Sequence, residues 1–233
     1  MLVLITGSAG QIGQHLISNL KGKYKFRGLD VKPTPQIDDY VVASVTDREA
    51  VNHAARGADA IIHLSNIGGE WEQALQSMIG TKNVFEAAQE NEVNRVVFAS
   101  RGGVHPRAFY PRSMTRTADL LTHPDTYYTT TKVFGEGLGD MFSSRYGIGV
   151  VSVRIGNFNK NRDQPDDPHH LSHEDCVRVF EAAMTADVNG RHERVFGVSD
   201  SNWPLYDIEH GRNVIGYNPK DKSVVPEDQI ERA

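Results

Sequence analysis

Cysteine is nearly absent from this chain, and so are long apolar runs and blocks of like charge. The single cysteine, Cys176, leaves no partner for a disulfide within the chain and fits a reducing compartment. No apolar run approaches the ~20 residues of a membrane-spanning helix. Lysines and arginines (25) are mixed with aspartates and glutamates (30), so the net charge of −5 suggests neither a nucleic acid nor a membrane partner. Because a strand-like run begins at Leu2, we expect no secretory signal and a cytoplasmic protein.

Short runs rich in apolar and β-branched residues alternate along the chain with helical patterns. This rhythm predicts an α/β fold, with a doubly wound, mainly parallel sheet of the Rossmann type and helices on both faces. Strands are expected at 3–6, 25–30, 38–42, 58–64, 95–100, 149–155 and 194–198, and helices at 14–21, 47–55, 71–91, 128–146 and from Ser172 onward. We expect residues 1–158 to form a dinucleotide-binding domain, and residues 159–233 to form a small substrate-binding part packed on it. Ligands of such sheets bind beyond the carboxyl ends of the strands.

A glycine-rich turn follows the first apolar run. Gly7, Gly10 and Gly13 lie between this expected strand and a helix, and Asp30 ends the second expected strand, 17 residues after Gly13. Such a turn lets a phosphate approach the backbone, and the helix N-terminus favours its negative charge. An acid at about this spacing is typical of a group that binds a ribose diol. The alternative is an ordinary turn between a strand and a helix.

Tyr128 and Lys132 lie four residues apart at the head of an expected helix, which places both side chains on one face. A tyrosine needs a neighbouring cation to act as a base near neutral pH, because its usual pKa is about 10. The pair is therefore a candidate general base and its partner. By itself this spacing is common, and only its position after the glycine turn and the fifth strand favours a catalytic role.

The segments TGSAGQIG, AIIHL, IGTKNVFEAA, RVVFAS, YTTTKVFGE and VRIGN, together with Asp30, resemble in this order the extended short-chain dehydrogenases, the NAD-dependent epimerase/dehydratase family. The likeness covers about residues 1–160. Within that family, HLSHED, FGVSDSNWPLYD and IGYNPKD are similar to segments of uronate dehydrogenases, which oxidise C1 of a hexuronic acid to a lactone. The short C-terminal part, some 75 residues, also suggests a small unactivated sugar rather than a nucleotide sugar.

This resemblance implies NAD as cofactor, and hydride transfer from the sugar to NAD with Tyr128 as base. Asp30 implies NAD rather than NADP, although Lys32 is close by, and Ser44 stands where relatives commonly have an aspartate at the adenine. The implied cofactor-binding residues are Gly7, Gly10, Gln11, Ile12, Asp30, Ser44, Val45, Leu64, Ser65, Asn66, Tyr128, Lys132 and Ile155.

The chain departs from the family at the third catalytic residue, a serine after the fifth strand. Direct alignment places Arg101 at that position, whereas counting back from Tyr110 places Gly103 there and makes His105 a substrate-facing histidine. Ser100 is a third candidate if the loop shifts, and otherwise a threonine, a histidine or a water must supply the donor.

The resemblance also implies an arginine that holds the substrate carboxylate, where a bidentate fork suits. Pro165 occupies that position, so Arg162 or Arg101 would have to substitute for it, and Asn157 would meet the nicotinamide end and the substrate.

Other residues favour plainer interpretations. His169 and His173 lack a third ligand at a fitting spacing, so no metal is expected. Arg107, Arg112 and Arg116 are interpreted as a solvated rim, with attraction of an anionic substrate as the alternative. Trp203, Tyr206 and Glu136 are interpreted as packing or structural residues.

Two other functions stay open: a sugar epimerase or dehydratase that retains its NAD, and an NAD-binding regulatory protein with weakened catalysis. The resemblance also allows a homodimer, or a larger homo-oligomer, through the helices expected at 71–91 and 128–146.

Overall fold

The computed structural model describes residues 1–163 and 165–231. A seven-stranded sheet runs through its centre in the order β3-β2-β1-β4-β5-β6-β7, and every neighbouring pair is parallel. Its strands are β1 (Leu2–Thr6), β2 (Lys25–Asp30), β3 (Tyr40–Val42), β4 (Ala60–His63), β5 (Arg95–Arg101), β6 (Gly149–Ile155) and β7 (His192–Gly197). The predicted doubly wound fold is therefore confirmed.

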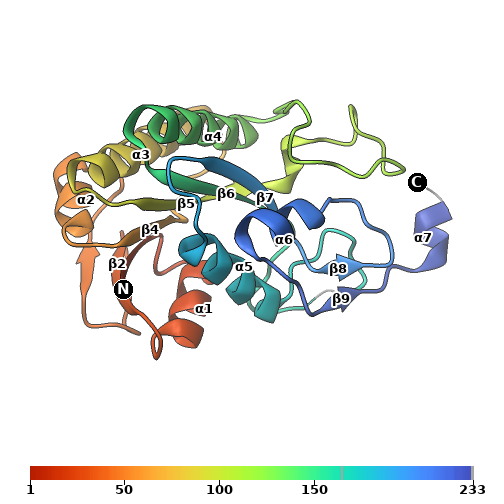
Figure 1. Ribbon diagram of the computed structural model, residues 1–233, viewed down its shortest axis with the longest axis horizontal. Coiled ribbons are helices and arrows are strands. Elements are labelled where there is room, and N and C mark those ends of the chain that lie inside the picture. Colours follow the sequence, from red (N-terminus) through yellow and green to blue (C-terminus); the bar gives the residue numbers. More distant parts are fainter. Residues whose placement is uncertain (164, 232–233) are drawn as a thin grey trace.

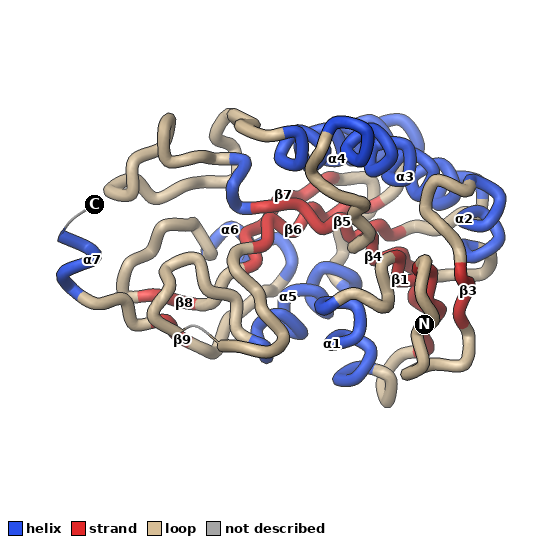
Figure 2. Tube along the Cα trace, turned by 180° about the vertical axis from the view of Figure 1, so that it is seen from behind, coloured by secondary structure: helices blue, strands red, loops and turns tan. Residues whose placement is uncertain are grey.

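Helices cover both faces of this sheet, so the molecule has three layers (Figure 1). Seen from behind, α2, α3 and α4 still lie on one side of the sheet and α1 and α5 on the other (Figure 2). The helices are α1 (Gln11–Leu20), α2 (Arg48–Ala55), α3 (Trp71–Glu90), α4 (Tyr127–Tyr146), α5 (His173–Thr185), α6 (Glu209–Ile215) and α7 (Glu227–Glu231), with a 3₁₀ turn at Gly102–Val104.

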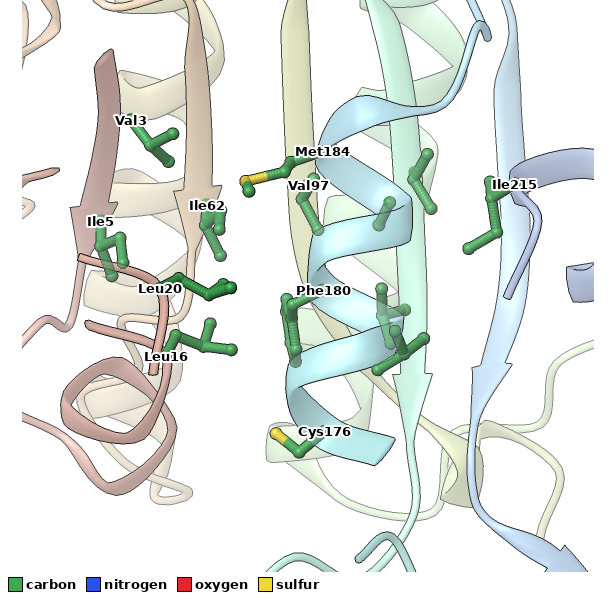
Figure 3. Packing of buried hydrophobic residues seen from close by; sticks show 14 of the residues in the cluster. Val3, Ile5, Leu16, Leu20, Ile62, Val97, Cys176, Phe180, Met184 and Ile215 are labelled. Carbon is green, nitrogen blue, oxygen red and sulfur yellow. The ribbon is translucent and has the colours of Figure 1, made fainter. Parts of the chain in front are cut away.

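The central strands β1, β4, β5 and β6 are mainly apolar because both of their faces are buried, whereas β2 and β7 also carry charged residues. In β1, Val3 and Ile5 pack toward α1 and α5, whereas Leu4 packs toward α2 and α3. Figure 3 shows the first of these cores, in which Leu16 and Leu20 of α1 and Phe180 and Met184 of α5 point at the sheet residues. Cys176 is buried in the same core.

The last third of the chain completes the sheet. β7 pairs with β6, and α5 lies beside α1, so residues on both sides of the predicted boundary at 158 share one core. The short strands β8 (Asp200–Ser201) and β9 (Lys222–Ser223), which were not expected, pair in a separate small sheet. These strands and α7 lie at one end of the molecule (Figure 1).

Two of the predicted boundaries are wrong in an informative way. The helix expected at 14–21 begins at Gln11, because Gly10 is its N-cap and the first turn follows the glycine loop at once. The strand expected at 194–198 begins at His192, where it pairs with Val150. In contrast, the helix expected from Ser172 onward does begin there, with Ser172 as its N-cap, since the Ser172 side chain accepts from the Asp175 N–H.

The chain order reverses between β1 and β4, and such a switch point leaves a crevice at the carboxyl ends of the strands. The candidate site described below lies at these ends. In the part of the chain that the structure describes, no helix has the length and apolar character needed to cross a membrane.

Candidate active site

A cavity of about 550 Å³ opens beyond the carboxyl ends of β1, β4, β5 and β6. Its volume lies in the range of small-molecule sites, roughly 300–1,000 Å³. Twelve of the residues proposed from the sequence line it: Gly7, Gly10, Gln11, Ile12, Leu64, Asn66, Ser100, Arg101, Tyr128, Lys132, Ile155 and Asn157.

The glycine loop forms one end of this cavity. Gly7 has a φ of +76°, and a Cβ there would lie 2.8 Å from the backbone N of Ser65. A Cβ on Gly13 would lie 2.6 Å from the carbonyl oxygen of Gly7, so the loop closes only with glycine at both positions. No side chain caps α1, and its first residues line the cavity. The free N–H groups and the positive end of the helix therefore suit a phosphate.

Asp30 lies beside this loop rather than on the cavity lining. Its carboxylate accepts hydrogen bonds from the backbone N–H of Ala9 at 3.0 Å and of Lys32 at 3.1 Å. The acid at the end of β2 is thus fixed next to the phosphate loop, which is the relation that a ribose contact requires.

Three other predicted cofactor residues also lie outside the cavity lining. Ser65 packs under Gly7, Val45 is buried, and Ser44 makes a hydrogen bond of 2.8 Å with Thr46. Their contact with a nucleotide stays a prediction.

Tyr128 and Lys132 project from the first turns of α4 into the cavity. The helix begins here because the Thr126 side chain accepts from the Thr129 N–H. The Lys132 Nζ lies 5.3 Å from the centroid of the Tyr128 ring and 5.3 Å from that of Phe98. Burial lowers the pKa of Lys132 to about 8. Burial raises the pKa of Tyr128 above its usual value, and the positive charge of Arg101 opposes that rise.

Ser100 is buried, and its hydroxyl is already engaged. Its Oγ donates to Glu136 Oε1 at 2.6 Å. The same carboxylate accepts from Arg154 Nε at 2.9 Å and from Arg154 Nη2 at 2.8 Å, in a bidentate pair. A hydroxyl has one proton, so in this arrangement Ser100 cannot donate to a ligand. The geometry does not support the predicted catalytic role of Ser100, because its hydroxyl already donates its hydrogen bond to Glu136.

Arg101, the last residue of β5, turns into the cavity instead. Its Cζ lies 5.5 Å from the centroid of the Tyr128 ring, and its Nη1 donates to Thr129 Oγ1 at 3.2 Å. Of the positions considered for the missing serine, Arg101 is the one that brings hydrogen-bond donors next to Tyr128.

Comparison with known proteins places this chain. The model of the NAD dependent epimerase/dehydratase family matches residues 3–174. The chain belongs to this family.

Several members of the family are similar over nearly the whole chain. An NAD-dependent glucose-6-phosphate dehydrogenase of Haloferax volcanii is 33% identical over 95% of this chain and 94% of its own length. A uronate dehydrogenase of Pseudomonas putida is 33% identical over 95% of this chain and 84% of its own. The crystal structure of a uronate dehydrogenase from Agrobacterium tumefaciens superimposes with a TM-score of 0.84 at 31% identity, covering 99% of this chain and 87% of that one.

The prediction of NAD as cofactor agrees with the family's name, and a variant of the same Agrobacterium enzyme has been solved in complex with NAD.

Two predicted substrate residues do not line the cavity of this family member. The His105 ring is buried, with its Nε2 3.0 Å from the carbonyl oxygen of Leu120, and burial lowers its pKa to about 4. It packs among Tyr110 and Phe196 rather than facing a substrate. Arg162 is exposed on the loop that follows β6 and lies outside the lining.

The prediction of a solvated arginine rim is wrong for Arg116, which is only 2% exposed. Its Nε donates to the carbonyl oxygen of His105 at 3.2 Å and its Nη2 to that of Tyr110 at 2.7 Å. It therefore ties the loop before α4 together, and backbone carbonyls replace the water that the sequence alone suggested.

Among the lining residues that were not proposed as site residues, two carry titratable side chains. His169 and Tyr206 face the cavity, and His169 Nδ1 lies 2.8 Å from the Tyr206 hydroxyl. Burial lowers the pKa of His169 and raises that of Tyr206 to about 12, so both are neutral near pH 7. The sequence did hold a signal for these two residues, because the segments HLSHED and FGVSDSNWPLYD, next to His169 and around Tyr206, are similar to segments of uronate dehydrogenases. Within residues 1–163 and 165–231, no group of three acidic, histidine or cysteine side chains could hold a metal ion.

Proposed function

We propose that the protein is an NAD-dependent dehydrogenase that oxidises the C1 hydroxyl of a small sugar acid, with a hexuronate as the expected substrate and an aldarolactone as the product. The observation that carries this proposal is that Tyr128 and Lys132 line the same cavity as the glycine loop and the start of α1. A dinucleotide site and a candidate base thus meet in one space. The names of relatives that match nearly the full chain, among them uronate dehydrogenases, support the choice of reaction.

The residues present fit a dinucleotide. Gly7, Gly10 and Gly13 carry no side chains that could obstruct a phosphate, and no side chain caps the N-terminus of α1, so its N–H groups are free to bind one. Asp30 would bind the adenosine ribose, and its negative charge would repel a 2′-phosphate, so NAD is expected rather than NADP. When bound, NAD supplies the acceptor for the hydrogen and electron pair that leave the sugar carbon.

Tyr128 would take the proton of the C1 hydroxyl at its phenolic oxygen. The cations near the Tyr128 ring, Arg101 and Lys132, favour the phenolate form that a base requires. Leu64 and Ile155 give this end of the cavity apolar walls, which would exclude water from the reacting centre.

The substrate would lie between Tyr128 and the wall formed by Asn157, His169 and Tyr206. These three side chains offer neutral hydrogen-bonding groups of the kind that a sugar's hydroxyls need. Because one cavity of about 550 Å³ must hold both the reactive end of the cofactor and the substrate, a small sugar is favoured over a nucleotide sugar.

The test is an assay of reduced nicotinamide with glucuronate or galacturonate as the sugar. The Tyr128→Phe variant is expected to lose roughly 10²–10⁴-fold in kcat, the usual contribution of a general base, and to bind NAD as before by calorimetry. Tyr127→Phe is the matched control, because Tyr127 precedes it on the same helix and is 53% exposed.

Other outcomes would favour the other functions. Cofactor that co-purifies with the protein, without net reduction by free sugars, would favour an epimerase or dehydratase. Turnover that does not change in Tyr128→Phe would exclude Tyr128 as the base.

We further propose that two copies associate through α3 and α4. These helices pack against each other and leave a set of large apolar side chains exposed: Trp71, Leu75, Ile79, Phe134 and Met141. Residues 71, 75 and 79 follow at intervals of four, so they form one stripe on α3.

A further inference from the structure

Arg101 occupies one of the positions considered for the catalytic serine of related enzymes, but its side chain is a charged guanidinium. Ser100 precedes it on β5, and the Ser100 hydroxyl donates to Glu136 beneath the cavity. The side chain of Arg101, the last residue of β5, reaches the start of the same helix α4, where it bonds Thr129 rather than Glu136. The donor that the strand presents to the cavity is therefore a guanidinium.

The guanidinium is held close to Tyr128. Its Nη1 donates to Thr129 Oγ1 at 3.2 Å, and Thr129 Oγ1 in turn lies 3.2 Å from Asp125 Oδ1. A guanidinium carries five N–H donors in a planar fork, so this single bond leaves others for a ligand.

Gly103 makes room for this arrangement. A Cβ at position 103 would lie 2.5 Å from Arg101 Nε and 2.8 Å from its Cζ. Any larger residue there would displace the guanidinium from its place in the cavity. Arg101 and Gly103 therefore act as a pair, and they are the two positions at which the alternative alignments place the missing serine.

We propose that Arg101 donates a hydrogen bond to the reacting oxygen of the sugar and serves as the positive charge that stabilises ionised Tyr128. This inference rests on the proposed function. In the step, the O–H bond of the C1 hydroxyl breaks and its proton passes to the Tyr128 oxygen. The C1–H bond breaks, its hydrogen and bonding electron pair would both pass to NAD as acceptor, and a C=O bond forms at the oxygen that Arg101 contacts.

The charged and titratable groups that line the cavity with Tyr128 come from several elements. Arg101 belongs to β5, Lys132 to the next turn of α4, and His169 and Tyr206 to the loops that follow β6 and β8. His169 and Tyr206 are neutral near pH 7. Burial raises the pKa of Tyr128 above its usual value, and the charge of Arg101 opposes that rise, so the nearby cations are the groups that favour the phenolate.

The first measurement needs no turnover. A 3-nitrotyrosine incorporated at position 128 titrates near neutral pH with a visible colour change. We expect Arg101→Gln to raise its midpoint by about one unit, the low end of the shift caused by a charge within ~4–6 Å. Arg101→Lys should keep most of the wild-type midpoint, and Gly103→Ala should raise it. Arg107→Gln is the control, because Arg107 is exposed and lies outside the cavity lining. A midpoint that does not move in Arg101→Gln would overturn the proposal.

The second measurement separates the reacting oxygen from the acid group of the sugar. With glucuronate and with a neutral aldose, Arg101→Gln is expected to lose about 10²-fold in kcat, as when one preorganised donor is removed. If Arg101 held the carboxylate instead, KM would rise for glucuronate alone and the kcat for the neutral aldose would be unchanged, which refutes the proposed contact. Failure of the wild-type protein to reduce NAD with any sugar would refute the proposed function, whereas the nitrotyrosine titration would still decide whether Arg101 acts on Tyr128.

Discussion

Replacing Glu136 by glutamine should destabilise the protein strongly, because the carboxylate neutralises a buried arginine. Glu136 is 3% exposed and Arg154 is 1% exposed. Removing the negative charge leaves the cation buried without its partner, which costs about 3–5 kcal/mol of unfolding free energy. In a chain of this length each kcal/mol lowers Tm by roughly 2–4 °C, so Tm should fall by roughly 6–20 °C.

The loss of unfolding free energy in Glu136→Gln should depend on pH in one direction. Burial by itself would raise the pKa of Glu136, but the hydrogen bonds and positive charge of Arg154, with Ser100 and Arg194, lower it below its usual value of 4.5. A carboxyl whose pKa is depressed by folding stabilises the protein above its unfolded pKa and loses this effect as pH falls through the folded value. The difference between wild type and Glu136→Gln should therefore be full near pH 7 and should shrink below about pH 4.5.

The assay is urea unfolding followed by circular dichroism, at neutral and at acidic pH. Glu86→Gln is the matched control, because Glu86 pairs with Lys82 on the surface at 2.8 Å, and such pairs contribute about 0–1 kcal/mol. Adding Arg154→Met to Glu136→Gln removes the stranded cation and should recover part of the loss. If Glu136→Gln cost no more than Glu86→Gln, the reasoning about the buried pair would be refuted.

Two further predictions concern α3 and α4. Burial lowers the pKa of Lys132 from 10.5 in the unfolded chain to about 8 in the folded protein. Between pH 8 and pH 10.5 the unfolded chain therefore binds more protons than the folded protein. The free energy of unfolding of the wild-type protein should rise by about 3 kcal/mol as pH increases through this window. Urea unfolding of Lys132→Met should lack this rise, and an equal rise in both proteins would contradict it. Light scattering should give a mass of twice 25.9 kDa for the wild-type protein. Ile79→Glu should give a monomer, because Ile79 is 48% exposed and lies on the proposed contact. A wild-type monomer would exclude that contact.

The fold could be predicted because its signals are local. Each buried strand is a short apolar run, and the glycines at 7, 10 and 13 mark the turn after the first one. Tyr128 and Lys132 could also be recognised, since one turn of helix places them on the same face whatever surrounds them.

Pairings between distant residues could not be predicted in the same way. Ser100 and Glu136 are 36 positions apart, and their hydrogen bond depends on how β5 lies against α4. The same holds for Arg116. The sequence predicted a solvated side chain, but in the folded loop it donates to the backbone carbonyl oxygens of His105 and Tyr110. No short-range pattern encodes such contacts, which arise only when the chain packs.

The position of β7 has a consequence for the protein during its synthesis. β6 ends at Ile155, but the strand that pairs with its edge, β7, is made only later, from His192 to Gly197. Until the ribosome has made β7, the N–H and C=O groups on the edge of β6 that faces away from β5 have no strand to bond, and an unpaired edge can join the strand of another chain. A nascent or cleaved form that stops before position 192 is therefore the species in which aggregation should begin.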